Sequence, residues 1–444
     1  MVNDGNNKTN ITGVRTWVLI VHLKITFKNF LSKFAKRSRK SRYMRILHTA
    51  DWHLGKRLDN FSRLEEQIQV MDEIVQIADE QQVDLILIAG DLFDSFNPGT
   101  EAIDLFYKTL KKLANNGRRP VIAISGNHDS PALIDAPDPL ARECGIVLIG
   151  QPKAVVKPFV LENFALTHTS EGFIEIKLKD RAYPIRVIHT PYANETRLKQ
   201  YLGEDKGAAL NNILAEHWQS IAETYCDENG VNILTTHLYM NKKGEALIEE
   251  PDGEKPIKIG NADLVFSDSI PPQVQYTALG HIHRNQNIGT AEKPVYYSSS
   301  PLCYSFSEAG QTKYINIVDA TPGKTVQIHK IALKKGRPLF RKTFQTIDEA
   351  AEWLEQNPES LVELIIRLDT FLKAEERNRL YKAHDGIIHL IPVIKNTDAN
   401  TAESTEIHIN QDIRGLFRDY FKSENNQLEP NAEILDLFNE ILND

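Results

Sequence analysis

Five apolar runs in this chain each end in a short string of residues that bind metal ions. The runs have the aliphatic and β-branched composition of strands, and residues 85–89 are continuously apolar, as in a strand covered on both faces. In layered α/β folds the ligand crevice lies at the carboxyl ends of the strands, so the strings are expected to meet at one rim. The strings are Asp51-Trp-His53, Gly90-Asp91, Gly126-Asn127-His128-Asp129, Thr236-His237 and Gly280-His281-Ile-His283.

The donor types in these strings favour a pair of divalent cations. Asp91 has no imidazole beside it and suits a carboxylate that bridges two ions, while Asn127 adds a neutral oxygen. Nitrogen and oxygen donors without a thiolate suit Mn²⁺, Fe²⁺ or Zn²⁺, and two such ions side by side can attack a phosphate ester. The expected ligands are Asp51, His53, Asp91, Asn127, His237, His281 and His283.

We expect His128 to act on phosphate rather than to hold a metal ion. Its neighbour Asn127 takes the ligand role, so the imidazole would point elsewhere on the rim. There it would stabilise negative charge on phosphorus or protonate the leaving oxygen. Asp129 is expected to orient that imidazole from outside the metal shell. Five other histidines are interpreted as ordinary core or surface residues: His189, His217, His329, His389 and His408.

Composition sets the class of protein. The 444 residues carry a net charge of −8, although residues 1–43 are strongly basic, so the rest of the chain is acidic. An acidic body is unlike a sequence-specific DNA reader but does not exclude nucleic acid, because metal ions or a partner can hold phosphates. The three cysteines form no Cys-x-x-Cys pair, which favours a reduced, cytoplasmic compartment. No apolar run is long enough for a membrane span.

Four segments are expected along the chain. Residues 1–43 are interpreted as a disordered extension or as sequence upstream of a true start at Met44; a DNA-binding arm is the alternative. Residues 44–335 hold all the metal-binding strings, and 336–395 alternate strand and helix in a small α/β unit. Residues 396–444 are a linker and two short amphipathic helices that must pack on the body or on a partner. Within the large segment, Ser62-Arg-Leu-Glu65 predicts a capping box that begins a helix.

The order of motifs from Met44 to about Ser300 resembles the calcineurin-like metallophosphoesterase superfamily. A closer resemblance is to the SbcD family, the nuclease subunits of bacterial SbcCD complexes. That family usually has a glycine where this chain has Ser299. The strings that carry the resemblance are Met44-Arg-Ile-Leu-His-Thr-Ala-Asp-Trp-His-Leu-Gly-Lys56, Ala89-Gly-Asp-Leu-Phe-Asp94, Ser125-Gly-Asn-His-Asp-Ser130, Ala278-Leu-Gly-His-Ile-His283 and Tyr297-Ser-Ser-Ser-Pro-Leu302 with Phe306-Ser-Glu308.

The resemblance implies an α+β fold, namely a four-layer α/β/β/α sandwich with a small α/β capping domain and C-terminal helices. It also implies two Mn²⁺ ions, with Asp91 shared between them and His128 acting in the transition state. One ion would be held by Asp51, His53, Asp91 and His283, and the other by Asp91, Asn127, His237 and His281.

The activity implied is that of a DNA nuclease in end processing, recombination and repair. It would degrade duplexes as a 3′→5′ exonuclease and cut single strands and hairpins as an endonuclease. The expected assembly is a homodimer within a heterotetramer, whose partner, an SbcC-type ABC ATPase, binds the helical tail. Lys56, Arg57 and Arg284 are possible DNA contacts. The alternatives are a metallophosphoesterase acting on a nucleotide or cyclic phosphodiester, and a DNA-end tether without activity.

Overall fold

The computed structural model describes residues 43–250, 264–369 and 372–394, together with 417, 418, 421, 430, 434, 435 and 438. Nearly all of the predicted extension 1–43 and of the predicted linker and tail 396–444 therefore lies outside the described residues, as does His408. Among the described residues, no helix is both long and apolar enough to cross a membrane.

The described chain divides into two units. The first runs up to Lys342 and includes Asn357–Leu364 and His384–His389. The second comprises Thr343–Gln356, Ile365–Ala383 and the residues from Leu390 onward. The predicted metal-binding strings all fall in the first unit.

The first sheet of the large unit has the strand that begins at Met44 near its middle. This strand, β1, pairs in parallel with β4 and antiparallel with β17. Because β1, β4, β5 and β6 are parallel neighbours, their carboxyl ends meet at one edge of the sheet. The strands in sheet order are β18 (Gln327–Ala332), β17 (Tyr314–Ala320), β1 (Met44–Thr49), β4 (Leu85–Ala89), β5 (Val121–Ile124) and β6 (Ile146–Ile149).

The second sheet of this unit also has a parallel centre. Strands β10, β11, β14 and β16 pair in parallel, so their carboxyl ends also lie at one edge. The strands in sheet order are β15 (Gln286–Asn287), β16 (Val295–Tyr297), β14 (Tyr276–Gly280), β11 (Val231–His237), β10 (Ile185–Thr190), β9 (Phe173–Leu178), β8 (Phe164–Ser170) and β7 (Phe159–Val160).

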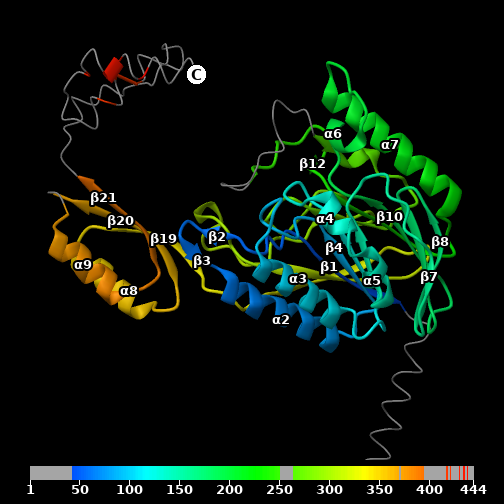
Figure 1. Cartoon of the computed structure of the whole chain (residues 1–444), viewed down its shortest axis with the longest axis horizontal. Coiled ribbons are helices and arrows are strands. Elements are labelled where there is room, and N and C mark those ends of the chain that lie inside the picture. Colours follow the sequence, from blue (N-terminus) through cyan, green and yellow to red (C-terminus); the bar gives the residue numbers. More distant parts are fainter. Residues whose placement is uncertain are drawn as a thin grey trace, which may run out of the picture. The chain divides into compact units, whose positions relative to one another are not determined.

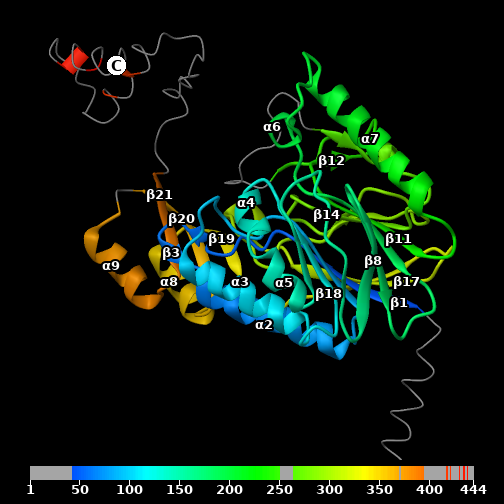
Figure 2. The ribbon, with the colours of Figure 1, turned by 45° about the vertical axis from the view of Figure 1, so that its right-hand side comes forward.

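Three apolar cores hold the layers together. One lies between the two sheets and takes Ile46 and Leu87 from the first and Val187 and Ile233 from the second. A second core joins the other face of the first sheet to α2 (Leu64–Glu80) and α3 (Thr100–Leu113), and a third joins the second sheet to α7 (Lys206–Tyr225). Figure 1 shows α2 and α3 on one side of the paired sheets and α7 on the other, and Figure 2 shows the same order. The predicted α/β/β/α sandwich is confirmed.

The start of α2 differs from the sequence prediction. The helix begins at Leu64 with Arg63 in the cap position, so the predicted capping box at Ser62 and Glu65 is wrong. The reason is burial: the Arg63 guanidinium is inaccessible and pairs with Glu66, with Nε 2.6 Å from Oε1. That pair, rather than a serine hydroxyl, fixes the first turn.

Shorter elements connect these layers. The remaining elements of the large unit are β2 (Arg57–Leu58), β3 (Phe61–Ser62), α4 (Pro131–Asp135), α5 (Asp138–Glu143), α6 (Glu195–Leu198), β12 (Met240–Asn241), β13 (Val265–Phe266), η1 (Ser267–Ser269) and η2 (Phe306–Glu308).

The predicted small α/β segment has the expected order of elements. Its strands pair in the order β19-β20-β21, and helices α8 and α9 come from the connections between them. The bounds are β19 (Leu339–Phe344), α8 (Ile347–Gln356), β20 (Leu361–Leu368), α9 (Ala374–Ala383) and β21 (Ile387–Ile394).

Candidate metal centre

All five metal-binding strings follow strand ends of the two sheets, as predicted. Asp51 and His53 follow β1, Asp91 follows β4, and Asn127 and His128 follow β5; His237 ends β11, and His281 and His283 follow β14. Backbone hydrogen bonds fix two of these loops together, because Asp51 N–H donates to Gly90 O and His53 N–H donates to Asp91 O, each at 3.0 Å.

Glycines allow the strings to approach each other closely. A Cβ on Gly126 would lie 2.0 Å from Asp91 Oδ1, and a Cβ on Gly90 would lie 2.3 Å from His237 Nδ1. A Cβ on Gly280 would lie 1.9 Å from the carbonyl oxygen of Ala89. These contacts are too short for any side chain, so the packing of the two sheets at this rim depends on glycine.

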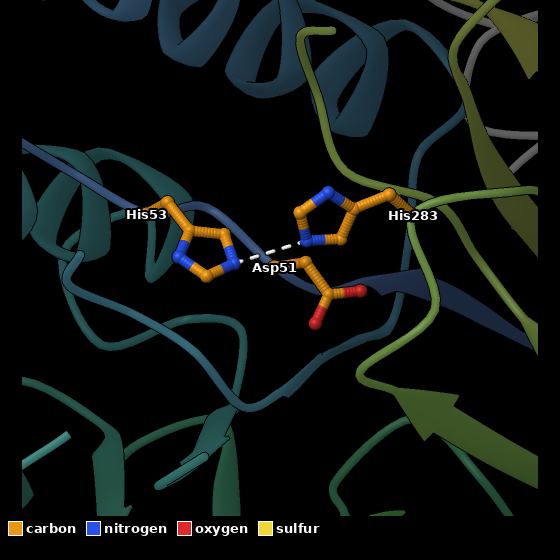
Figure 3. Close-up of side chains that lie close together, drawn as sticks. All are labelled: Asp51, His53 and His283. Carbon is orange, nitrogen blue, oxygen red and sulfur yellow. Dashed lines mark hydrogen bonds between the residues drawn. The ribbon is translucent and has the colours of Figure 1, made fainter. Parts of the chain in front are cut away.

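One group of donors consists of Asp51, His53 and His283, all of them buried. Figure 3 shows the two imidazoles turned toward each other beside the carboxylate. The two Nε2 atoms are 3.1 Å apart, and two nitrogens bound to one ion at about 2.1 Å lie at a similar separation. Asp51 Oδ2 is buried and has no hydrogen-bond partner among the described residues, which is costly unless a cation faces it.

A second group consists of Asp91, His237 and His281. His237 Nε2 lies 3.2 Å from Asp91 Oδ2 and 3.0 Å from Asn127 Oδ1, so the amide joins this group. Asp91 Oδ2 is also 3.6 Å from His53 Nε2 in the first group. The structure thus brings the seven predicted ligands together, with Asp91 between two donor groups. This is the arrangement that a bridging carboxylate requires.

Hydrogen bonds set which ring nitrogen of two histidines is available. His237 Nδ1 lies 2.8 Å from the carbonyl oxygen of Ala89, which only accepts, so Nδ1 carries the hydrogen and Nε2 faces Asp91. His281 Nε2 lies 2.7 Å from Glu250 Oε1. The nitrogen of His281 that is left for a cation is therefore Nδ1.

His128 lies at the edge of this cluster and is held through its other neighbour in space, Asp94. Its Nδ1 lies 2.8 Å from the main-chain carbonyl oxygen of Asp94, and its backbone N–H donates to Asp91 Oδ1 at 2.9 Å. The ring packs edge-on against His53 with centroids 4.8 Å apart. Nδ1 therefore carries a hydrogen, and Nε2 is the nitrogen left for chemistry.

Asp129 has a different role from the one predicted. Its carboxylate accepts the backbone N–H groups of Gly126, Leu92 and Phe93 at 2.7, 3.0 and 2.9 Å. The imidazole of His128 is oriented by the Asp94 carbonyl instead, so the predicted orienting contact from Asp129 is wrong. The consecutive position in the sequence suggested a side-chain pair, whereas Asp129 ties the loop after β4 to the loop after β5.

Two other carboxylates at the site had no predicted role. Asp94 Oδ1 lies 2.9 Å from Lys56 Nζ and 3.7 Å from His53 Nδ1. Glu308 Oε1 lies 3.3 Å from His283 Nδ1. The signals in the sequence were weak: Asp94 closes the string Gly-Asp-Leu-Phe-Asp, and Glu308 stands three residues after Ser305, as a capping residue does.

The three predicted DNA contacts lie in unlike surroundings. Lys56 is buried, is paired with Asp94, and lies 6.0 Å from the ring centre of Tyr304. Arg57 is exposed, and its guanidinium donates to the carbonyl oxygen of Asn60. Arg284 is exposed and lines a cavity of about 400 Å³ beside His283. Their contact with DNA is still a prediction.

The charges of the cluster are set by mutual pairing. Burial opposes the charge of His237, but the Asp91 and Asp51 carboxylates raise its pKa to about 9. Burial raises the pKa of Asp51. Burial also disfavours ionised Asp91, yet His237 and its neighbours hold the pKa of Asp91 well below its ordinary value. Protonated imidazole thus supplies the positive charge that a metal ion would supply, and metal binding would release that proton.

The backbone is strained at four of the expected ligands. Asp51, His53, Asp91 and His281 have φ values of 54°, 43°, 48° and 100°, in the left-handed region. Such conformations cost of order 1–3 kcal/mol each and cluster at functional sites. With the unpartnered carboxylate oxygen of Asp51 and the nitrogen and oxygen donors, this strain indicates that the residues fit divalent metal ions.

A family model described as Calcineurin-like phosphoesterase matches residues 44–285. The chain belongs to this family. It is 36% identical over 408 residues to the SbcD subunit of the SbcCD nuclease of Bacillus subtilis, which covers 90% of this chain and 97% of the relative. It is 32% identical to the corresponding protein of Rhodobacter capsulatus, over 67% of this chain and 71% of the relative. A solved dimetal phosphatase from Danio rerio is similar at 10% identity and a TM-score of 0.37, covering 66% of this chain and all of that chain.

Family membership gives the cluster its chemistry. The phosphoesterase is a phosphodiester hydrolase, and the grouped aspartates and histidines are its site for divalent metal ions. Metal ions at such a site lower the pKa of water and neutralise charge that develops on phosphate.

Proposed function

We propose that this phosphoesterase is a Mn²⁺-dependent DNA nuclease, acting on duplexes as a 3′→5′ exonuclease and on single strands and hairpins as an endonuclease. The observation that carries the proposal is the extent of the match to the Bacillus subtilis nuclease protein. It covers 97% of that relative, whereas the phosphoesterase model ends at residue 285. A phosphoesterase specific for a small nucleotide would have no reason to match such a nuclease beyond the catalytic part.

The residues divide into two roles in this proposal. Asp51, His53, Asp91 and His283 hold one ion, and Asp91, Asn127, His237 and His281 hold the other. His128 Nε2 faces the scissile phosphate, where it stabilises negative charge or protonates the leaving oxygen. The support for this division is that two of the compact donor groups are Asp51–His53–His283 and Asp91–His237–His281.

The test is a Mn²⁺-dependent digestion of duplex DNA labelled at its 3′ ends, of a hairpin and of a cyclic dinucleotide, with a chelator as control. We expect early release of labelled mononucleotides from the duplex and cleavage near the hairpin loop. Hydrolysis of the cyclic dinucleotide alone would favour the nucleotide-specific alternative. Binding of DNA ends without hydrolysis of any substrate would favour a tether.

We further propose that the tail binds an SbcC-type ATPase, within a complex that contains two copies of this chain. Of the described tail residues, Phe417 and Phe438 stack with ring centres 3.9 Å apart, which supports two helices packed through an apolar face. Removing the chain from Ile413 onward should leave hydrolysis of a generic diester unchanged and abolish co-purification of the ATPase. Undiminished co-purification would contradict this assignment, and light scattering would give the number of copies.

A further inference from the structure

The strongest unexplained feature near the site is the buried carboxylate of Glu308. It comes from η2, outside every metal-binding string, and its side chain is 3% exposed. Glu308 Oε1 lies 3.3 Å from His283 Nδ1, on the side of the ring away from His53. An ionised carboxylate only accepts hydrogen bonds, so His283 Nδ1 must be the donor. The lone pair of His283 Nε2 is then left for a cation.

Glu308 itself is fixed from several directions. Its Oε1 accepts the backbone N–H groups of Tyr304 and Ser305, each at 3.1 Å. Its Oε2 accepts from the Lys313 ammonium and, at 3.4 Å, from the Ser300 hydroxyl. Lys313 Nζ also donates to the main-chain carbonyl oxygen of His283 at 2.8 Å. The carboxylate and the backbone of the histidine are therefore held by the same ammonium group.

The simpler role for Glu308 is to cap η2, since Ser305 and Glu308 form a capping box. That role needs only an oxygen acceptor, and glutamine serves as well as glutamate in such a box. It does not require burial of the carboxylate, an ion pair with Lys313, or contact with an imidazole of the metal cluster. These three features are what a carboxylate that orients a metal-binding histidine requires.

We propose that Glu308 is a positioning residue that fixes the Nδ1–H form of His283 and so directs Nε2 at the cation beside Asp51 and His53. This inference rests on the proposed metal ligands. Glu308 touches neither cation nor substrate and acts only through the imidazole. Lys313 keeps the carboxylate ionised and in place.

The experiment measures Mn²⁺ binding to the metal-free full-length chain without DNA, by paramagnetic resonance of free Mn²⁺ during titration. The main variant is Glu308→Gln with Lys313→Met, because this pair keeps the cap and leaves no unpaired buried charge. We expect affinity to fall about 10–100-fold at one of two sites, with an unchanged melting temperature. A correctly folded double variant that binds both ions as the wild type does would overturn the proposal.

A matched control comes from the small sheet. Glu363 Oε2 lies 3.1 Å from His389 Nδ1, and its Oε1 accepts from Arg341, so it has the same types of partner away from the metal cluster. Glu363→Gln should leave both Mn²⁺ affinities unchanged. If the wild type binds no Mn²⁺, the metal assignment of the proposed function fails, and this inference fails with it.

A measurement on the unmodified protein does not depend on the folding of any variant. Nitrogen NMR of metal-free, histidine-labelled protein reports which ring nitrogen carries the hydrogen, and the His283 signal is assigned by its loss in His283→Asn. We expect the hydrogen on Nδ1. A hydrogen on Nε2 with a bare Nδ1 would overturn the proposal.

Discussion

At the scale of single residues, His128 is directed by one carbonyl oxygen. Asp94 accepts from Nδ1 at 2.8 Å through its main chain, while its side chain accepts from Lys56. Burial opposes the charge, but His53 and Lys56 lower the pKa of Asp94 to about 2, so the carboxylate stays ionised at neutral pH. The loop that presents His128 is therefore braced independently of the metal ligands.

Replacing His128 with alanine separates chemistry from metal binding. We expect both Mn²⁺ ions to bind with nearly unchanged affinity and the rate of DNA cleavage to fall by about 10²–10⁴-fold, as for loss of a general acid. His329→Ala, at a side chain 57% exposed, is the control. Because His53, Asp91 and His128 also form a compact donor group, loss of a metal ion in the variant would show that His128 is a ligand instead.

Gly126 offers a test of the close approach between loops. Its Cβ in Gly126→Ala would lie 2.0 Å from Asp91 Oδ1 and 2.3 Å from Asp91 N. We expect a loss of about 1–3 kcal/mol in unfolding free energy together with weaker Mn²⁺ binding, measured by denaturant titration and metal titration. Gly99→Ala is matched, since nothing lies within 4 Å of its added Cβ. Equal behaviour of the two variants would contradict the packing argument.

The ligand residues could be predicted because donor chemistry and strand ends coincide in the sequence. Asp94 and Glu308 could not, because each acts on a histidine that is distant in the chain. Ser299 lies between these cases. It stands where the related nucleases usually have glycine, and its φ is 81°. Its hydroxyl exchanges hydrogen bonds with the backbone of Tyr314 at 3.0 Å, which offsets the strained conformation.

At the scale of elements, the buried strands were predicted well and the half-exposed ones were not. The bounds of β4 and β5 agree with the sequence prediction, since continuous apolar runs identify a covered strand. β8 and the helix α7 were not predicted. The sequence of β8 mixes exposed polar residues into the strand, and α7 buries Asn211 among its apolar positions. Neither pattern has a clean period.

The buried pair at the start of α2 gives an element-scale prediction. Glu66→Gln leaves the Arg63 guanidinium buried beside a neutral amide, and Glu66 Oε2 also accepts the backbone N–H of Arg337 at 2.6 Å. We expect a loss of about 3 kcal/mol in unfolding free energy. Lys108→Met removes an exposed ion pair with Asp104 on α3 and should change stability by less than about 1 kcal/mol. Similar losses in the two variants would contradict the prediction.

At the scale of the whole molecule, two histidines are fully buried in the central strands of the sheets. Burial lowers the pKa of His48 on β1 and of His189 on β10 to about 3. Both are neutral in the folded protein. The unfolded chain takes up protons below its ordinary histidine pKa of about 6.5, so stability is present above that pH and lost as pH falls toward 3.

His189→Leu tests this source of acid sensitivity. Neither ring nitrogen of His189 has a hydrogen-bond partner among the described residues, so leucine breaks no hydrogen bond within that part of the chain. We expect the fold to persist at pH 7 and the loss of stability between pH 6 and 4 to be shallower by about 1.4 kcal/mol per pH unit. Denaturant titrations at each pH measure the slope. A slope equal to that of the wild type would mean that other groups govern acid unfolding.

The left-handed backbone of Asp51, His53, Asp91 and His281 restricts how these positions can change in evolution. Among residues with a Cβ, asparagine, aspartate and histidine enter this region most readily. The same three side chains carry the oxygen and nitrogen atoms that bind divalent cations. A substitution that keeps the bend of the loop therefore tends to keep a donor as well. The geometry of the main chain alone would preserve the capacity to bind metal, even in a descendant that has lost its original substrate.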